Sequence, residues 1–144
     1  MLWRVLQAHQ MSLPPEAVVC FANTGKEDEA TLRFVQDCSE QWNVPITWLE
    51  FQDTKSKFKV VNFKTASRDG EPFEALIRKR KYLPNPVARF CTGELKVLTI
   101  ERYFKSIDKP EFETMVGLRA DEPRRAAKMR ESKLIPLFDA GITQ

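Results

Sequence analysis

The chain has 144 residues, of which 42% are hydrophobic and 30% are charged, the composition of an ordinary globular domain rather than a disordered segment. Its longest apolar runs are too short to span a bilayer and no signal peptide precedes them, so we expect a single cytoplasmic domain over 1–144, with no membrane contact. Three cysteines without Cys-x-x-Cys spacing, and a single histidine, argue against a protein-built zinc site or a four-cysteine iron–sulfur cluster, so no metal site is expected.

Helical and strand patterns alternate along the chain. Helices are indicated where apolar residues recur at helical spacing, and strands where short apolar runs are bounded by turn residues. In chain order, we expect a helix over 1–10, a strand over 17–22, a helix over 27–42, a strand over 46–51, a short strand or extended loop over 58–63, helices over 72–81 and 92–106, a strand over 112–118, a helix over 121–130 and a strand over 135–138. This alternation predicts an α/β fold with a mostly parallel sheet and helices on both faces.

The strand over 17–22 runs directly into the turn 23–27, with the sequence Asn-Thr-Gly-Lys-Glu. Ligands of open α/β sheets bind where strands end and helices begin, so this turn marks one edge of a small-molecule site. Gly25 allows a ligand to approach the backbone closely. The three acidic residues that begin the next helix favour contact with a ribose or base over a phosphate on the helix end. An ordinary strand-to-helix turn is the alternative.

A second candidate segment, residues 89–96, has the sequence Arg-Phe-Cys-Thr-Gly-Glu-Leu-Lys. We expect Cys91 in a loop just before a helix that Thr92 caps. A cysteine at such a position between cations is the one candidate for a reactive thiol, with simple packing as the alternative. Arg89 and Lys96 are expected to face an anionic ligand.

A third segment, residues 117–125, places an arginine after the expected strand end at Gly117. Arginine forks match the oxygens of phosphate or sulfate, so Arg119 is a candidate anion-binding residue. A surface ion-pair network is the alternative. The basic runs 78–81 and 119–130 leave nucleic acid as an alternative partner, although such runs more often form a solvated face.

Taken together, these segments resemble the phosphoadenosine phosphosulfate (PAPS) reductase family, within the adenine nucleotide alpha-hydrolase-like superfamily, and especially its phage-type members. The resemblance is carried by residues 21–27 with 31–35, 89–96, 117–122 and 136–143. It implies a Rossmann-like sheet that binds an adenine nucleotide as substrate or ligand, and a parent activity of sulfonucleotide reduction or nucleotide-dependent transfer. A thiol reductant protein is an implied partner.

The same resemblance implies the nucleotide-binding residues one by one. Asn23, Thr24 and Gly25 match the turn beside the nucleotide. Arg89 and Lys96 match the cations around the cysteine segment, and Arg119 matches the anion-binding arginine. Arg124 or Arg125 joins Arg119, and of these two we retain Arg125.

The chain departs from the family pattern at both ends. The family's first strand, its Ser-Gly-Gly-x-x-Ser phosphate loop and its C-terminal cysteine segment have no counterpart here. The resemblance therefore implies a shortened chain that binds no cofactor alone, with no catalytic residue assigned and enzymatic activity left open. A non-catalytic nucleic-acid-binding module and a degenerate remnant with an exposed sheet edge are the alternatives.

Overall fold

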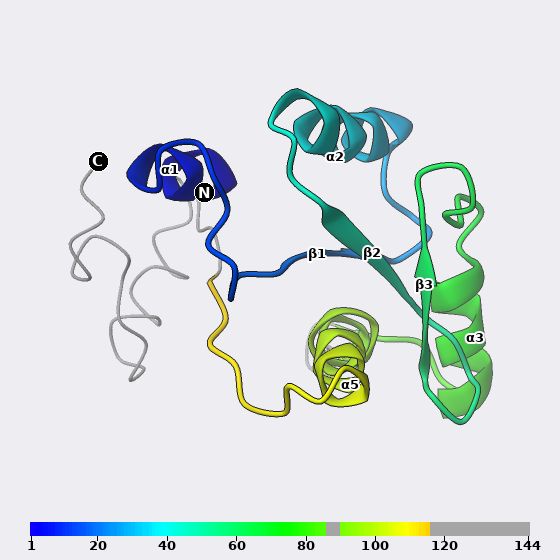
Figure 1. Ribbon diagram of the computed structural model, residues 1–144. Coiled ribbons are helices and arrows are strands. Elements are labelled where there is room, and N and C mark those ends of the chain that lie inside the picture. Colours follow the sequence, from blue (N-terminus) through cyan, green and yellow to red (C-terminus); the bar gives the residue numbers. More distant parts are fainter. Residues whose placement is uncertain (86–89, 116–144) are drawn as a thin grey trace. The chain divides into compact units, whose positions relative to one another are not determined.

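The structure, a computed structural model, describes residues 1–85 and 90–115 (Figure 1). The chain divides into two compact units, Ala17–Phe112 and a unit formed by the residues before and after it. The second unit contains α1 (Leu2–Ala8), which lies within the helix predicted over 1–10. This helix ends early because Gln10 and Met11 adopt φ values of 54° and 62°, which a right-handed helix does not allow.

The unit Ala17–Phe112 is built on a three-stranded sheet in the order β1 (Val19–Asn23), β2 (Ile46–Phe51), β3 (Phe58–Val61). The α/β class is confirmed, but the expectation of a mostly parallel sheet is not met among the described strands. β1 and β2 pair in parallel, whereas β2 and β3 are antiparallel. A parallel crossover needs about a dozen residues or more, and the short segment between β2 and β3 permits only a hairpin-type connection.

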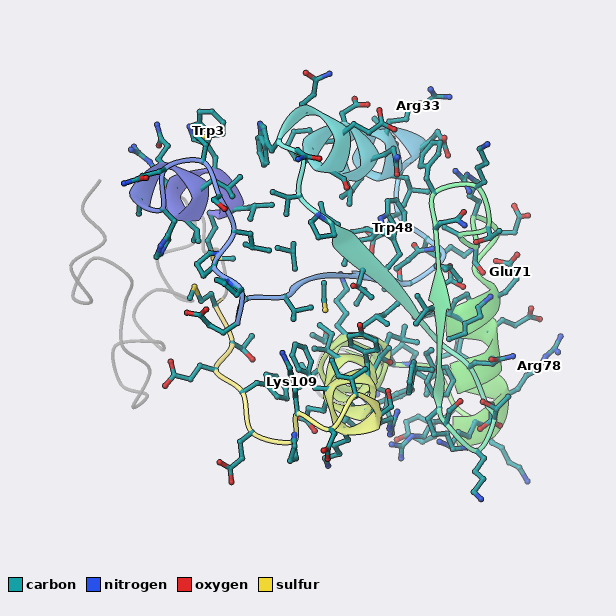
Figure 2. The ribbon with its side chains drawn as sticks, viewed as in Figure 1. Trp3, Arg33, Trp48, Glu71, Arg78 and Lys109 are labelled. Atoms are coloured by element: carbon teal, nitrogen blue, oxygen red, sulfur yellow. The ribbon has the colours of Figure 1, made fainter. Side chains whose placement is uncertain are left out.

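Helices cover both faces of this sheet, as predicted. Alternate residues of β2 point to opposite faces, so Trp48 packs with Leu32 of α2 (Glu29–Gln41) and Phe51 packs with Leu76 of α3 (Glu71–Arg80). Figure 1 shows α2 and α5 (Leu98–Ser106) on opposite sides of β1 and β2. Arg33 of α2 and Arg78 of α3 point away from the sheet (Figure 2).

The start of α2 differs from the prediction in a way that affects the site. The pattern placed the helix start at residue 27, but α2 begins at Glu29. The Asp28 carboxylate accepts a hydrogen bond from Ala30 N at 2.7 Å and so acts as the N-cap. Glu27 therefore lies in the loop before the helix rather than in its first turn. Phe34 of α2 is 64% exposed.

The helix predicted over 92–106 is interrupted. A helical turn, α4 (Phe90–Thr92), leads into a π-helical segment, η1 (Gly93–Val97), and then into α5. The predictions of a loop at Cys91 and an N-cap at Thr92 are therefore wrong, because Thr92 has helical backbone angles and its side chain makes no cap hydrogen bond. The π-helical turn is supported by the Thr99 hydroxyl, which donates to the Glu94 carbonyl at 2.8 Å.

The strand predicted over 112–118 does not form over 112–115, the part that the structure describes. Phe112 instead stacks on Phe104 of α5, with ring centroids 4.3 Å apart, and this contact takes the place of strand pairing. The remainder of that segment, the helix predicted over 121–130 and the strand over 135–138 lie outside the described residues. Over 1–85 and 90–115, no helix has the length and apolar character that crossing a bilayer requires.

Candidate functional site

A buried polar network lies at the carboxyl ends of β1 and β2. Asn23 and Glu50 are register partners of the parallel pair, and both are fully buried. The Asn23 amide donates to the Glu50 carboxylate at 2.7 Å and to the Ser67 carbonyl at 2.8 Å. The backbone N–H and the hydroxyl of Ser67 donate to the two Glu50 oxygens at 2.6 and 2.8 Å. The network thus ties the loop after β1 to the loop after β3.

Lys59 completes this network and keeps Glu50 charged. Its ammonium lies 2.9 Å from the second Glu50 oxygen. Burial by itself raises the pKa of the Glu50 carboxyl, but the hydrogen bonds from Lys59, Ser67 and Asn23 outweigh it and hold the pKa below its ordinary value. A buried carboxylate with every oxygen in use is a structural anchor and is closed to ligands.

Asn23 also shapes the turn that follows it. Its side-chain oxygen accepts the Gly25 N–H at 3.0 Å, and Gly25 has a φ of 75°. A Cβ at Gly25 would lie 2.8 Å from Pro72 Cδ, so only glycine fits the close approach of this turn to the start of α3. Asn23 therefore positions the turn, since both ends of its amide are occupied by protein partners.

Lys26 joins the same two loops from the other side. Its ammonium donates to the Asp69 carbonyl at 2.8 Å, and its side chain crosses Gly70 so closely that any Cβ there would clash with it. Gly70 has a φ of 96° and stands at the N-cap of α3. The two glycine turns and Lys26 thus form one compact junction at this edge of the sheet.

A cavity of about 220 Å³ lies beside this junction. Its lining comes from the turn after β1, from α3 and from the α4–η1 segment. The lining residues are Thr24, Lys26, Phe73, Cys91, Thr92, Leu95 and Lys96. Two lysines and two threonines belong to this lining, and most of the lining surface is apolar. The cavity therefore combines an apolar wall with residues that can carry contacts to an anion.

An ion pair connects the β1 turn to η1 beside the cavity. Lys96 Nζ lies 3.4 Å from Glu27 Oε1, and the same oxygen accepts a hydrogen bond from the Thr24 hydroxyl at 3.1 Å. The Glu27 side chain is 24% exposed and that of Lys96 47% exposed. Two cavity-lining donors therefore converge on one carboxylate.

The η1 segment that carries Lys96 is held in place by a partly buried charge cluster. Glu94 is paired with Arg80 of α3 and, at 3.3 Å, with Arg102 of α5. Burial raises the pKa of the Glu94 carboxyl, but the hydrogen bonds from the two arginines prevail and lower it. Since Glu94 lies two positions before Lys96, this cluster fixes the cavity wall on which Lys96 stands.

The structure brings together several predicted site residues. Thr24, Cys91 and Lys96 line the one cavity, and Asn23 and Gly25 form the adjoining turn. Arg89, Arg119 and Arg125 lie outside the described residues.

Four further residues line the cavity and were not among the predicted site residues: Lys26, Phe73, Thr92 and Leu95. Lys26 stands in the predicted turn and could have been chosen as a cation beside Gly25. The α3 residue Phe73 gave no such signal, because only the tertiary fold brings α3 against the turn.

The three cysteines are free and differ in their surroundings. Cys91 is half-buried on the cavity wall. Burial raises the pKa of the Cys20 thiol on β1 to about 11, and it also raises that of Cys38, to which the neighbouring Asp37 charge contributes. Cys20 and Cys38 therefore act as packing residues, whereas Cys91 lines the cavity described above.

The basic run 78–81 is engaged within the fold. Arg78 pairs with Glu74 at 2.7 Å and Arg80 pairs with Glu94, while the Lys79 ammonium lies 5.5 Å from the centroid of the Phe51 ring. These contacts give the run a role within the protein and add no specific support to the nucleic-acid alternative.

Comparison with known proteins gives a phage relative. The chain is similar to the uncharacterized nin region protein ORF290 of Escherichia phage lambda. The two are 27% identical over 114 residues, which cover 73% of this chain and 39% of the phage protein. The chain thus spans about two fifths of its relative's length. The similarity to a phage protein agrees with the expected likeness to phage proteins and extends no further than that. No family model matches the chain, and neither does any solved structure.

Proposed function

We propose that the chain is a PAPS reductase-like, Rossmann-type domain and that its cavity holds part of an adenine nucleotide. One observation carries the proposal. Thr24 and Lys96, which belong to segments far apart in the sequence, line the same cavity at the carboxyl end of β1. That edge of an α/β sheet is where nucleotides bind.

The chemistry of the lining supports an anionic part of the ligand in this position. Lys26 and Lys96 supply positive charge, and Thr24 and Thr92 supply hydroxyls that can donate to phosphate or sulfate oxygens. Pockets for whole drug-sized ligands measure about 300–1,000 Å³. At about 220 Å³ the cavity is smaller, so it takes one phosphate or sulfate with the adjoining ribose. Arg89, Arg119 and Arg125 are proposed as further cations around the nucleotide.

The proposed parent activity is sulfonucleotide reduction or nucleotide-dependent transfer, in the cytoplasm. In the reductive case a thiol reductant protein serves as the partner. Cys91 lies on the cavity wall and so is proposed as a neighbour of the nucleotide, and no catalytic role is assigned to it.

Calorimetric titration with adenosine 3′,5′-bisphosphate tests this function. We expect saturable binding, and we expect Lys96→Met to weaken it by about 1.5–3 kcal/mol, the range for a hydrogen bond to a charged group. Lys64→Met is the matched control, because Lys64 is exposed in the turn after β3 and lies away from the cavity. Absence of saturable binding, or equal effects of the two variants, would contradict the proposal.

A further inference from the structure

We infer that Glu27 determines the charge selectivity of this cavity. Its carboxylate holds the donors of Thr24 and Lys96, and an anionic ligand has to take these donors over. The inference rests on the proposed function and adds a residue that the family resemblance does not place in the site.

The geometry behind this inference is a shared acceptor. One oxygen of Glu27, Oε1, accepts the Thr24 hydroxyl at 3.1 Å and lies 3.4 Å from Lys96 Nζ. Thr24 and Lys96 line the cavity, whereas Glu27 does not. The carboxylate, itself outside the lining, therefore holds the polar ends of two lining residues.

Thr24 and Lys96 have few hydrogen-bond protons to offer an anion, because Glu27 already accepts from both side chains. A threonine hydroxyl has one proton to donate, and that of Thr24 is directed at Glu27. The ammonium of Lys96 has two further protons, but its positive charge is partly balanced by the carboxylate. An anion in the cavity thus meets a weakened cation and a hydroxyl that has to turn.

The ion pair is also easy to displace. A contact of 3.4 Å is long for a charge-assisted hydrogen bond, and both side chains are partly exposed. Ion pairs in such settings contribute little to stability, since water and salt screen them. Glu27 can therefore give up Lys96 to a ligand phosphate without unfolding the turn, because Asn23 and Gly25 hold that turn independently.

The consequence for selectivity follows from charge. A phosphate or sulfate bound by Lys96 lies close to the Glu27 carboxylate and is repelled by it. A neutral ligand with hydroxyl groups meets no such repulsion. Glu27 thus lowers the affinity for anions selectively, and its neutral isostere should raise that affinity.

The test measures binding of adenosine 3′,5′-bisphosphate, inorganic phosphate and adenosine to the full chain, to Glu27→Gln and to Glu29→Gln. Glu29 is the matched control, since it lies two positions on and pairs with Arg68 and Arg33 instead of a cavity residue. We expect Glu27→Gln to bind the bisphosphate and inorganic phosphate roughly 1.5-fold to fivefold more tightly, the range for loss of one screened charge contact. Adenosine binding should stay unchanged, and Glu29→Gln should match the parent chain.

Three results would overturn the inference. Weaker binding of the bisphosphate and adenosine to Glu27→Gln would mean that the carboxylate binds a ligand hydroxyl. Equal gains in both variants would mean a general effect of net charge. Failure of inorganic phosphate to shift the amide resonances of Thr24 and Lys96 in Glu27→Gln would mean that the cavity takes no anion. If the bisphosphate alone fails to bind while phosphate still shifts these resonances, the nucleotide proposal falls and the role of Glu27 stands.

Discussion

Asn23 and Glu50 stand opposite each other at the carboxyl ends of β1 and β2, and a 2.7 Å hydrogen bond joins their fully buried side chains. Asn23 leads directly into the turn that carries Thr24, while Glu50 holds the backbone of Ser67. One buried pair therefore fixes two loops, and these loops meet again where Lys26 donates to the Asp69 carbonyl. The cavity lies beside these two loops, so the buried Asn23–Glu50 pair also helps to determine its shape.

The first prediction concerns the charge of Glu50. Because the pKa of this carboxyl is lowered in the folded chain, its contribution to stability is present above its unfolded pKa and is lost as the pH falls through the folded pKa. Glu50→Gln should lower the free energy of unfolding at pH 7 by about 2–4 kcal/mol, since it removes a buried acceptor that holds Lys59 and Ser67.

Urea unfolding at pH 7 and at pH 3.5 checks this prediction. The loss caused by Glu50→Gln should shrink at the lower pH, because protonation of Glu50 in the unfolded parent chain then removes part of the stability that the carboxylate contributes. Glu74→Gln is the control, because Glu74 is exposed and pairs with Arg78 on the surface of α3. It should change stability by no more than about 0.5 kcal/mol. Equal effects of the two variants would show that Glu50 is no anchor.

Asn23→Asp tests the other half of the same pair. The substitution keeps the oxygen that accepts the Gly25 N–H but replaces the amide donor by a second carboxylate oxygen facing Glu50. Two buried carboxylates in contact disfavour each other's ionised forms. The variant should be destabilised by about 2–4 kcal/mol at pH 7 and should recover part of this loss near pH 5. A variant as stable as the parent at both values would contradict the hydrogen-bond assignment.

A pair of glycine substitutions tests the junction of the two turns. Gly25→Ala should destabilise the chain by about 1–3 kcal/mol, because the φ of 75° and the nearby Pro72 leave no room for a Cβ. Gly93→Ala is its counterpart, since no atom lies within 4 Å of a Cβ at that position of η1. Alanine suits a helix better than glycine, so this variant should be neutral or up to about 1 kcal/mol more stable. Thermal unfolding distinguishes the two, and a reversed order would refute the described turn.

Cysteine labelling tests the position of Cys91 on the cavity wall. With iodoacetamide at pH 8, the Cys20 thiol should react slowly, because burial raises its pKa to about 11 and the thiolate is the reactive form. Adenosine 3′,5′-bisphosphate should slow the labelling of Cys91 and leave that of Cys20 unchanged, since only Cys91 lines the cavity. Peptide mass spectrometry follows each site. Protection of all three cysteines, or of none, would argue against a ligand in this cavity.

Much of the fold could be predicted because local patterns determine it. The apolar run 46–51 forms β2 over the same residues, and the start of α3 follows from Pro72. The site was less accessible to sequence reasoning. Glu27 was placed in a helix, because the pattern does not show that Asp28 supplies the cap. Its partner Lys96 lies 69 positions away, a separation over which no local rule operates.

The π-helical turn escaped prediction for a related physical reason. Its backbone depends on the Thr99 hydroxyl and on the pairing of Glu94 with arginines from two other helices. Sequence periodicity does not reveal such tertiary contacts. The burial of Glu50 could not be predicted for the same reason. A glutamate in an apolar strand can be recognised as a buried structural residue only when the groups that donate hydrogen bonds to it are known.

In the proposed function, the β1 turn and η1 bind one ligand between them. Nuclear magnetic resonance titration with adenosine 3′,5′-bisphosphate tests it most directly. The amide resonances of Thr24 and Lys96 should shift together and follow the same saturation curve. Shifts confined to one of these segments, or two curves with different midpoints, would contradict it.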